Sequence, residues 1–186
     1  MEVVLASQSP RRRELMQLLN IGFSVRVADV EETLLANATP AQQARHLSAI
    51  KAKAVAKPGE IVIGADTIVV LGDRILGKPK DRQEAVQMLR LLSGNTHQVM
   101  TGVTVISDKK EVSCTEVTEV TFRQLTEEEI LHYVNTLEPM DKAGAYGIQG
   151  GAAKFVEGIR GDYFNVVGLP VCKLSQILRD FMEETQ

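Results

Sequence analysis

Cysteine, tryptophan and long apolar runs are scarce in this sequence. Its two cysteines, Cys114 and Cys172, form neither a CxxC pair nor a metal-ligand spacing, so we expect two reduced thiols. No run of about 18 apolar residues is present, and we therefore expect no membrane span. The N-terminus has no basic segment ahead of an apolar one, so we also expect no signal peptide and a cytoplasmic location.

An excess of positive charge is also missing. The chain carries 21 Lys and Arg against 24 Asp and Glu, a formal net charge of −3. A general nucleic-acid binder usually has a strongly basic face, so we expect no nucleic-acid partner. Positive charge is instead local, in residues 11–13 and at Lys51, Lys53 and Lys57. This distribution suits a small anionic ligand better than a polymer.

The apolar residues point to one α/β domain. They make up 44% of the 186 residues, which is enough to bury the core of a single domain over residues 1–186. Residues 61–70 form an aliphatic run without alternation, which is typical of a central strand buried on both faces. Residues 98–107 and 112–123 alternate and are joined by a short turn, which indicates an antiparallel pair. The sequence therefore predicts a mixed sheet flanked by helices.

Helix starts are marked by side chains that accept hydrogen bonds from free backbone N–H groups. Ser9-Pro10 and Thr39-Pro40 each combine a hydroxyl with proline at the first helical position. Asp81 with Glu84, and Thr126 with Glu129, are spaced as capping boxes. We expect a helix after each of these four signals and a last one after Leu169-Pro170. Residues 161–168 are instead expected to contain a further strand.

One carboxylate, Asp66, interrupts the aliphatic run. Burying a charged carboxylate has a free-energy cost on the order of several kcal/mol unless a cation or hydrogen bonds compensate for it. Asp66, within Gly64-Ala65-Asp66-Thr67, is therefore a candidate functional residue. The alternative is that Asp66 ends the strand and caps a turn, with Gly64 at a bulge.

Hydroxyl and guanidinium groups gather at the start of the first predicted helix. Residues 3–6 predict a strand, and residues 7–13 then place two serines and three arginines at the positive end of a helix. Free N–H groups and planar arginine donors at such an end can bind phosphate. The alternative is that the arginines are solvated surface residues.

Other charged residues have two possible roles. The acidic residues 29–32 include Glu32, and one of them could bind Mg²⁺ or Mn²⁺ if it met Asp66; otherwise they form a polar turn. Lys51 lies near the end of a helix predicted over residues 41–56, where it favours the helix dipole even without a ligand. Lys78 lies between Gly77 and Pro79, so its backbone is expected to be extended and fixed.

Residues 139–151 are rich in glycine and predict a loop, the kind of segment that often binds ligands. Gln149 lies between glycines in this loop. Its amide could contact the edge of a base with both a donor and an acceptor. The alternative is an exposed glutamine in a glycine turn.

Six blocks stand in order along nearly the whole chain: residues 5–12, 64–67, 77–79, 92–94, 141–150 and 167–170. Together these blocks resemble the signatures of the Maf family of nucleoside triphosphate pyrophosphatases. The resemblance implies an elongated α/β fold with two lobes and a central cleft, similar to that of the inosine triphosphate pyrophosphatases. It also implies hydrolysis of a nucleoside triphosphate to the monophosphate and pyrophosphate with a divalent cation, a homodimer, and an association with septum inhibition and removal of non-standard nucleotides.

The resemblance further implies a role for each matching residue. Asp66 matches the family's catalytic acidic residue, whose carboxylate accepts a proton from the attacking water. Glu32 matches a carboxylate associated with the metal, Mg²⁺, Mn²⁺ or Co²⁺. Asp66 could also be a metal ligand. Positions assigned to the triphosphate are matched by Ser7, Arg12, Lys51 and Lys78. Positions that distinguish subgroups are matched by Arg11, Thr67 and Gln149, and this combination resembles the branch that prefers dTTP and UTP.

Two other functions remain open from the sequence. The chain could be a nucleotide-binding regulator of division that needs no hydrolysis, or a pyrophosphatase for another modified nucleotide. Whether Asp66 takes the proton itself or acts chiefly by holding the metal is open as well.

Overall fold

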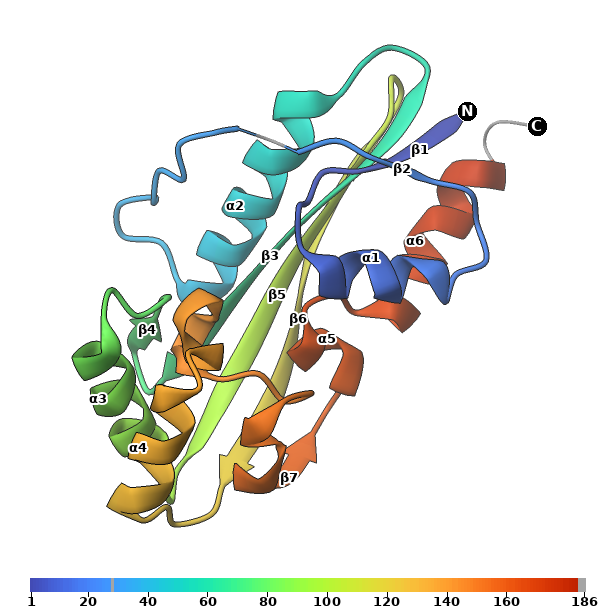
Figure 1. Ribbon diagram of the computed structural model, residues 1–186. Coiled ribbons are helices and arrows are strands. Elements are labelled where there is room, and N and C mark those ends of the chain that lie inside the picture. Colours follow the sequence, from blue (N-terminus) through green and yellow to red (C-terminus); the bar gives the residue numbers. More distant parts are fainter. Residues whose placement is uncertain (28, 184–186) are drawn as a thin grey trace. The chain divides into compact units, whose positions relative to one another are not determined.

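The sheet forms around strand β3 (Glu60–Leu71), which pairs with β1 (Glu2–Leu5), β4 (Arg74–Leu76) and β5 (Thr96–Ile106) in the computed structural model (Figure 1). The structure describes residues 1–27 and 29–183. Ten of the twelve residues of β3 are buried, so the predicted strand over residues 61–70 is confirmed. Continuous burial explains the lack of alternation, because both faces of β3 are covered.

The strand order is β2-β1-β3-β5-β6-β7, and β4 pairs with β3 outside this path. The other strands are β2 (Ser24–Val25), β6 (Glu111–Phe122) and β7 (Val156–Arg160). β1 runs parallel to β2 and β3, whereas β4 and β7 are antiparallel to their partners. The predicted mixed α/β sheet is therefore confirmed.

Contacts divide the chain into two compact units. Unit 1 comprises Met1–Thr67, Thr101–Glu116 and Gly168–Gln186, and unit 2 comprises Ile68–Met100 and Val117–Val167. Strands β3, β5 and β6 contribute residues to both. The expectation of a single domain over residues 1–186 stays a prediction.

Unit 1 contains helices α1 (Pro10–Gln17), α2 (Pro40–Val55) and α6 (Val171–Glu183). In Figure 1, α2 covers one face of its part of the sheet and α1 and α6 the other. The predicted caps are present, since Ser9 and Thr39 each accept a hydrogen bond from the backbone N–H three residues later.

Glycines allow α2 to lie directly on the sheet. A Cβ at Gly64 would lie 2.1 Å from the carbonyl oxygen of Ser48, and one at Gly102 would lie 2.0 Å from that of Ala44. Any larger residue would push the helix backbone away from β3 and β5. This close packing determines where side chains on the inner face of α2, including Lys51, meet β3.

Unit 2 contains α3 (Arg82–Leu92), α4 (Glu127–Asn135), α5 (Tyr163–Val167) and the 3₁₀ turns η1 (Glu138–Asp141), η2 (Ala143–Ala145) and η3 (Gly151–Phe155). Its core includes a cluster of rings packed edge to face: His97, Phe122, Tyr133, Tyr146 and Phe155. Tyr146 belongs to the glycine-rich loop of residues 139–151, and the hydroxyl of Tyr133 accepts a hydrogen bond from the N–H of Gly147 in the same loop.

One predicted element is wrong. Residues 161–168 form no strand, and Tyr163–Val167 is the short helix α5. Asp162 Oδ1 accepts a hydrogen bond from the N–H of Phe164 at 2.8 Å, and buried Asn165 donates to the carbonyl of Val99 at 3.1 Å. These contacts outweigh the strand preference of the aromatic and branched residues.

No helix among residues 1–27 and 29–183 is long and apolar enough to cross a membrane.

Candidate active site

The candidate site in unit 1 is built on Asp66, in the middle of β3. Only 8% of this residue is exposed. Because β3 continues to Leu71, the alternative in which Asp66 ends the strand is wrong. A carboxylate at this depth requires a compensating partner.

Lys51 of α2 provides that partner. Its Nζ donates a hydrogen bond to Asp66 Oδ1 at 2.5 Å and lies 2.9 Å from Oε1 of Glu32, in the segment between β2 and α2. The side chains of Lys51 and Asp66 are only 15% and 12% exposed, whereas that of Glu32 is 55% exposed. One ammonium group therefore holds together two carboxylates from distant parts of the sequence.

These two carboxylates fit a divalent metal. Mg²⁺ is usually bound by one or two carboxylates, with waters and substrate phosphates as its other ligands. In the part of the chain that the structure describes, no group of three or more His, Cys, Asp and Glu residues could hold a metal alone. Glu32 and Asp66 would therefore bind a metal together with the phosphates of a substrate.

Arg12, in the first turn of α1, joins three segments of unit 1. Its Nε donates to the carbonyl of Gly168 at 2.8 Å, its Nη1 to Ser7 Oγ at 3.3 Å, and its Nη2 to Thr67 Oγ1 at 3.0 Å. Burial lowers the pKa of the Arg12 guanidinium, and the negative charge of Asp66 acts in the opposite direction. The group stays charged. Each terminal nitrogen has a second N–H that could bind a phosphate oxygen.

The Asp66 and Arg12 clusters lie on opposite faces of β3, because side chains alternate along a strand. Asp66 faces Lys51 and α2, whereas Thr67 faces Arg12. β1 ends at Leu5, which pairs with Ile63, so residues 66 and 67 lie beyond the carboxyl end of this parallel neighbour. Ligands of open α/β sheets bind outside the carboxyl ends of parallel strands.

The start of α1 lies at this same end of β1. Ser7 is buried, and its Oγ accepts from the N–H of Ser9 at 3.2 Å as well as from Arg12. Arg11 lies in the first turn of α1 and is partly buried. The predicted serine and arginine cluster is thus at a helix N-terminus, and Arg12 is not a solvated surface residue.

The remaining predicted residues belong to unit 2. Lys78 is exposed in the segment after β4, where the carbonyl of Gly77 accepts from the N–H of Gly144 at 3.0 Å. Gln149 is exposed in a turn between η2 and η3. The structure thus forms two clusters in unit 1, one of Glu32, Lys51 and Asp66 and the other of Ser7, Arg12 and Thr67. Arg11 lies beside the second cluster in α1, and Lys78 and Gln149 lie in unit 2.

Two contributors to the site were not predicted from the sequence. Thr101 Oγ1 lies 2.9 Å from Thr67 Oγ1, and the carbonyl of Gly168 receives the hydrogen bond from Arg12 Nε. Gly168 lies in one of the six recognised blocks, which could have marked it. Thr101 has no sequence signal, because alternating threonines are ordinary in a strand.

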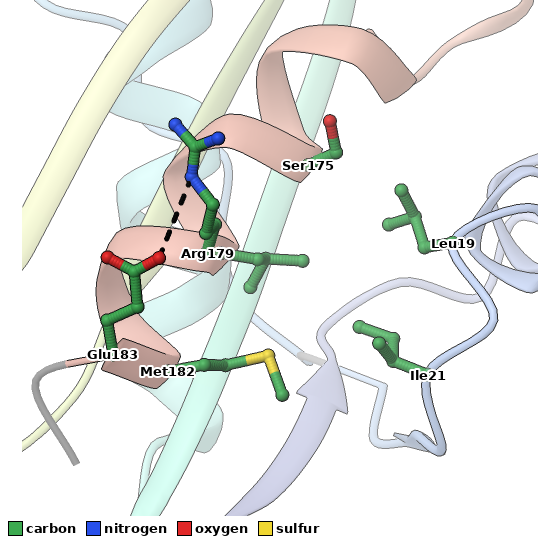
Figure 2. Close-up of a pocket in the computed structure, with 7 residues that line it drawn as sticks. Leu19, Ile21, Ser175, Arg179, Met182 and Glu183 are labelled. Atoms are coloured by element: carbon green, nitrogen blue, oxygen red, sulfur yellow. Dashed lines mark ion pairs between the residues drawn. The ribbon is translucent and has the colours of Figure 1, made fainter. Parts of the chain in front are cut away.

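A cavity of about 270 Å³ in unit 1 is separate from these residues. Figure 2 shows Arg179 and Glu183 of α6 near Met182, with Leu19 and Ile21 across from the helix. Its lining is mainly apolar, which does not suit a triphosphate. None of the predicted site residues lines it; the lining residues are Leu19, Ile21, Ser175, Leu178, Arg179, Met182 and Glu183.

Comparison with solved structures agrees with the fold. A HAM1 protein from Coxiella burnetii aligns with a TM-score of 0.54 at 18% identity, covering 97% of this chain and 99% of that one. The Ham1 protein of Staphylococcus aureus aligns with a TM-score of 0.53 at 14% identity, with the same coverage. The expected likeness to the inosine triphosphate pyrophosphatase fold is therefore confirmed.

Comparison of sequences is more specific. A protein of Bacillus cytotoxicus named dTTP/UTP pyrophosphatase is 56% identical over 96% of this chain and 94% of its own. Proteins of the same name from Bacillus cereus strain G9842 and Bacillus pumilus are 53% and 50% identical, each over 97% of this chain and over 95% and 96% of their own. The sequence profile described as Maf-like protein matches residues 2–181. The chain therefore belongs to the Maf family.

Proposed function

We propose that this protein is a nucleoside triphosphate pyrophosphatase that hydrolyses dTTP, UTP and modified pyrimidine triphosphates to the monophosphate and pyrophosphate. The observation that carries the proposal is the buried Asp66, held by Lys51 beside Glu32 at the carboxyl end of β1. The choice of dTTP and UTP is supported by relatives named dTTP/UTP pyrophosphatase, which are 50 to 56% identical to this chain over nearly its whole length.

The reaction needs a water molecule to attack the α-phosphorus. A new P–O bond forms there while the bond to the bridging oxygen breaks, and pyrophosphate leaves with that oxygen and its electron pair. Asp66 accepts the proton of the water, and Lys51 fixes the orientation of this carboxylate through Oδ1. Mg²⁺, Mn²⁺ or Co²⁺, held by Glu32 and Asp66, would supply positive charge to the phosphates and acidify the water.

Positive groups of this chain bind the triphosphate. The second N–H groups of Arg12 and the free N–H groups at the start of α1 suit phosphate oxygens, and Ser7 lies beside them. We include Lys78 among the phosphate ligands. Such charges offset the negative charge that develops on the leaving pyrophosphate.

We further propose that Arg11, Thr67 and Gln149 determine the preference for a pyrimidine base. A hydrogen-bonding site rejects a wrong base because its polar groups are then left without partners. Arg12 and Thr101 both contact Thr67, so this side chain is held in one orientation.

Pyrophosphate release across a panel of nucleoside triphosphates, each with Mg²⁺, Mn²⁺ or Co²⁺, tests the proposal. We expect dTTP and UTP to be the best substrates, and Asp66→Asn to lower kcat by about a hundredfold or more. Asp180→Asn, which changes an exposed aspartate of α6, is the matched control and should retain activity. Tight dTTP binding without pyrophosphate release would contradict the proposal and favour a regulator. A preference for a modified purine would identify another substrate.

The oligomer implied by the family is a homodimer, and we propose this state here as well. Light scattering on the purified chain measures it directly, and a mass equal to one chain of 20.4 kDa would contradict it.

A further inference from the structure

Gln149 is presented by a turn whose two ends are tied to the same pair of side chains. The turn spans Gly147 to Gly150 and is closed by a hydrogen bond from the N–H of Gly150 to the carbonyl of Gly147 at 3.1 Å. Within it, Ile148 is buried and Gln149 is exposed. Because Ile148 anchors the turn in the protein interior, the turn exposes the amide of Gln149 to solvent.

The first end of the turn is held by Tyr133 of α4. The N–H of Gly147 donates to Tyr133 Oη at 3.2 Å, and this hydroxyl donates in turn to Glu138 Oε1 at 2.9 Å. Tyr133 is 2% exposed, and its ring packs edge to face on Phe155 at 5.3 Å. Its position is thus set by the core of unit 2.

The second end is held by Glu138 of η1. The N–H of Gly151 donates to Glu138 Oε2 at 3.0 Å, so the two carboxylate oxygens each accept one hydrogen bond. A Cβ at Gly150 would lie 2.0 Å from Glu138 Oε1, so a larger residue there would displace this carboxylate. Lys142 also fixes the backbone of Glu138, because its Nζ donates a hydrogen bond to the Glu138 carbonyl at 2.6 Å.

We propose that Tyr133 and Glu138 are positioning residues for base selection, because together they hold both ends of the turn that presents Gln149. An amide discriminates between bases only when its donor and acceptor are held in place, since a mobile amide can adapt to a wrong base. The inference rests on the proposed role of Gln149. It adds two residues, outside the loop itself, on which that role depends.

Two conservative variants test the pair. Tyr133→Phe removes the hydroxyl that joins Gly147 to Glu138. Glu138→Gln replaces one carboxylate oxygen by an amide nitrogen, which cannot accept from Tyr133 or from Gly151. We expect either change to lower the preference for dTTP over dGTP, as the ratio of kcat/KM values, by about tenfold. The loss should come mainly from a higher KM for dTTP, with kcat changed by less than about twofold.

A double-mutant cycle separates positioning from general damage. In a Gln149→Ala background, Tyr133→Phe and Glu138→Gln should leave the dTTP to dGTP ratio unchanged, because no amide remains to be positioned. Amide hydrogen exchange at Gly147 and Gly151 should be faster in both single variants. Tyr163→Phe and Glu157→Gln change exposed residues of the same unit and are the matched controls.

The outcomes distinguish this inference from the proposal on which it rests. If Gln149→Ala lowers the preference but neither Tyr133→Phe nor Glu138→Gln does, or if their effects add fully to that of Gln149→Ala, the positioning role is overturned alone. If the wild type does not prefer dTTP, or Gln149→Ala leaves the preference intact, the role of Gln149 and the inference fail together.

Discussion

Lys51 Nζ lies 2.5 Å from Asp66 Oδ1, so a helix and the central strand of unit 1 are joined by a largely buried ion pair. Such a pair contributes little net stability by itself, because both groups lose water. Removing one partner, however, leaves an uncompensated charge. The same ammonium also holds Glu32, so the position of both proposed metal ligands depends on Lys51.

We expect Lys51→Met to lower the free energy of unfolding by about 3 kcal/mol, since Asp66 and Glu32 would then lack their cation. The double variant Lys51→Met with Asp66→Asn should recover much of this loss. Urea denaturation at neutral pH measures both. Lys53→Met is the control on the same helix, and its exposed pair with Glu111 should contribute less than about 1 kcal/mol. Equal losses for Lys51→Met and Lys53→Met would contradict the buried pair.

Arg12→Lys should weaken both substrate binding and packing at the start of α1. A lysine has one nitrogen and cannot contact Gly168, Ser7 and Thr67 at once from a planar group. We expect KM for dTTP to rise about tenfold or more. Steady-state kinetics of Arg12→Lys and of the exposed neighbour Arg13→Lys provide the comparison. Similar KM values for the two variants would show that the Arg12 contacts are unimportant.

Gly64→Ala tests the contact between α2 and β3. The new methyl group would meet the carbonyl of Ser48, so the helix must shift and Lys51 with it. We expect a loss of about 1 to 3 kcal/mol in the free energy of unfolding, together with lower activity. Gly22→Ala is the control, because nothing lies within 4 Å of a Cβ there. A fully active and stable Gly64→Ala protein would be incompatible with this packing.

His97 makes the stability of unit 2 depend on pH. Burial lowers the pKa of His97 from 6.5 to about 4. Between these values the unfolded chain binds more protons than the folded one, so stability should fall as the pH drops from 6.5 towards 4, by about 3 kcal/mol at most. His97→Gln should remove this dependence, whereas His132→Gln, on the exposed side of α4, should keep it. Thermal denaturation from pH 7 to pH 4 measures the slopes, and parallel slopes for wild type and His97→Gln would refute the assignment.

The helix starts and the central strand could be predicted because their signals are local. A cap joins residues three positions apart, and Ser9, Thr39, Asp81 and Thr126 all accept the expected hydrogen bond. The aliphatic run around Asp66 likewise records burial on both faces of β3. α5 could not be predicted, because distant partners such as the carbonyl of Val99 determine it.

The amino-acid sequence by itself determined the residue types of the site and the strands or helices that carry most of them, since these depend on short-range patterns. Only the tertiary structure decided which groups meet. Lys51 joins Asp66 to Glu32, and Arg12 joins Ser7, Thr67 and Gly168, across separations of up to 156 residues. Such contacts follow from how closely α2 and α1 pack on the sheet, which no spacing along the chain records.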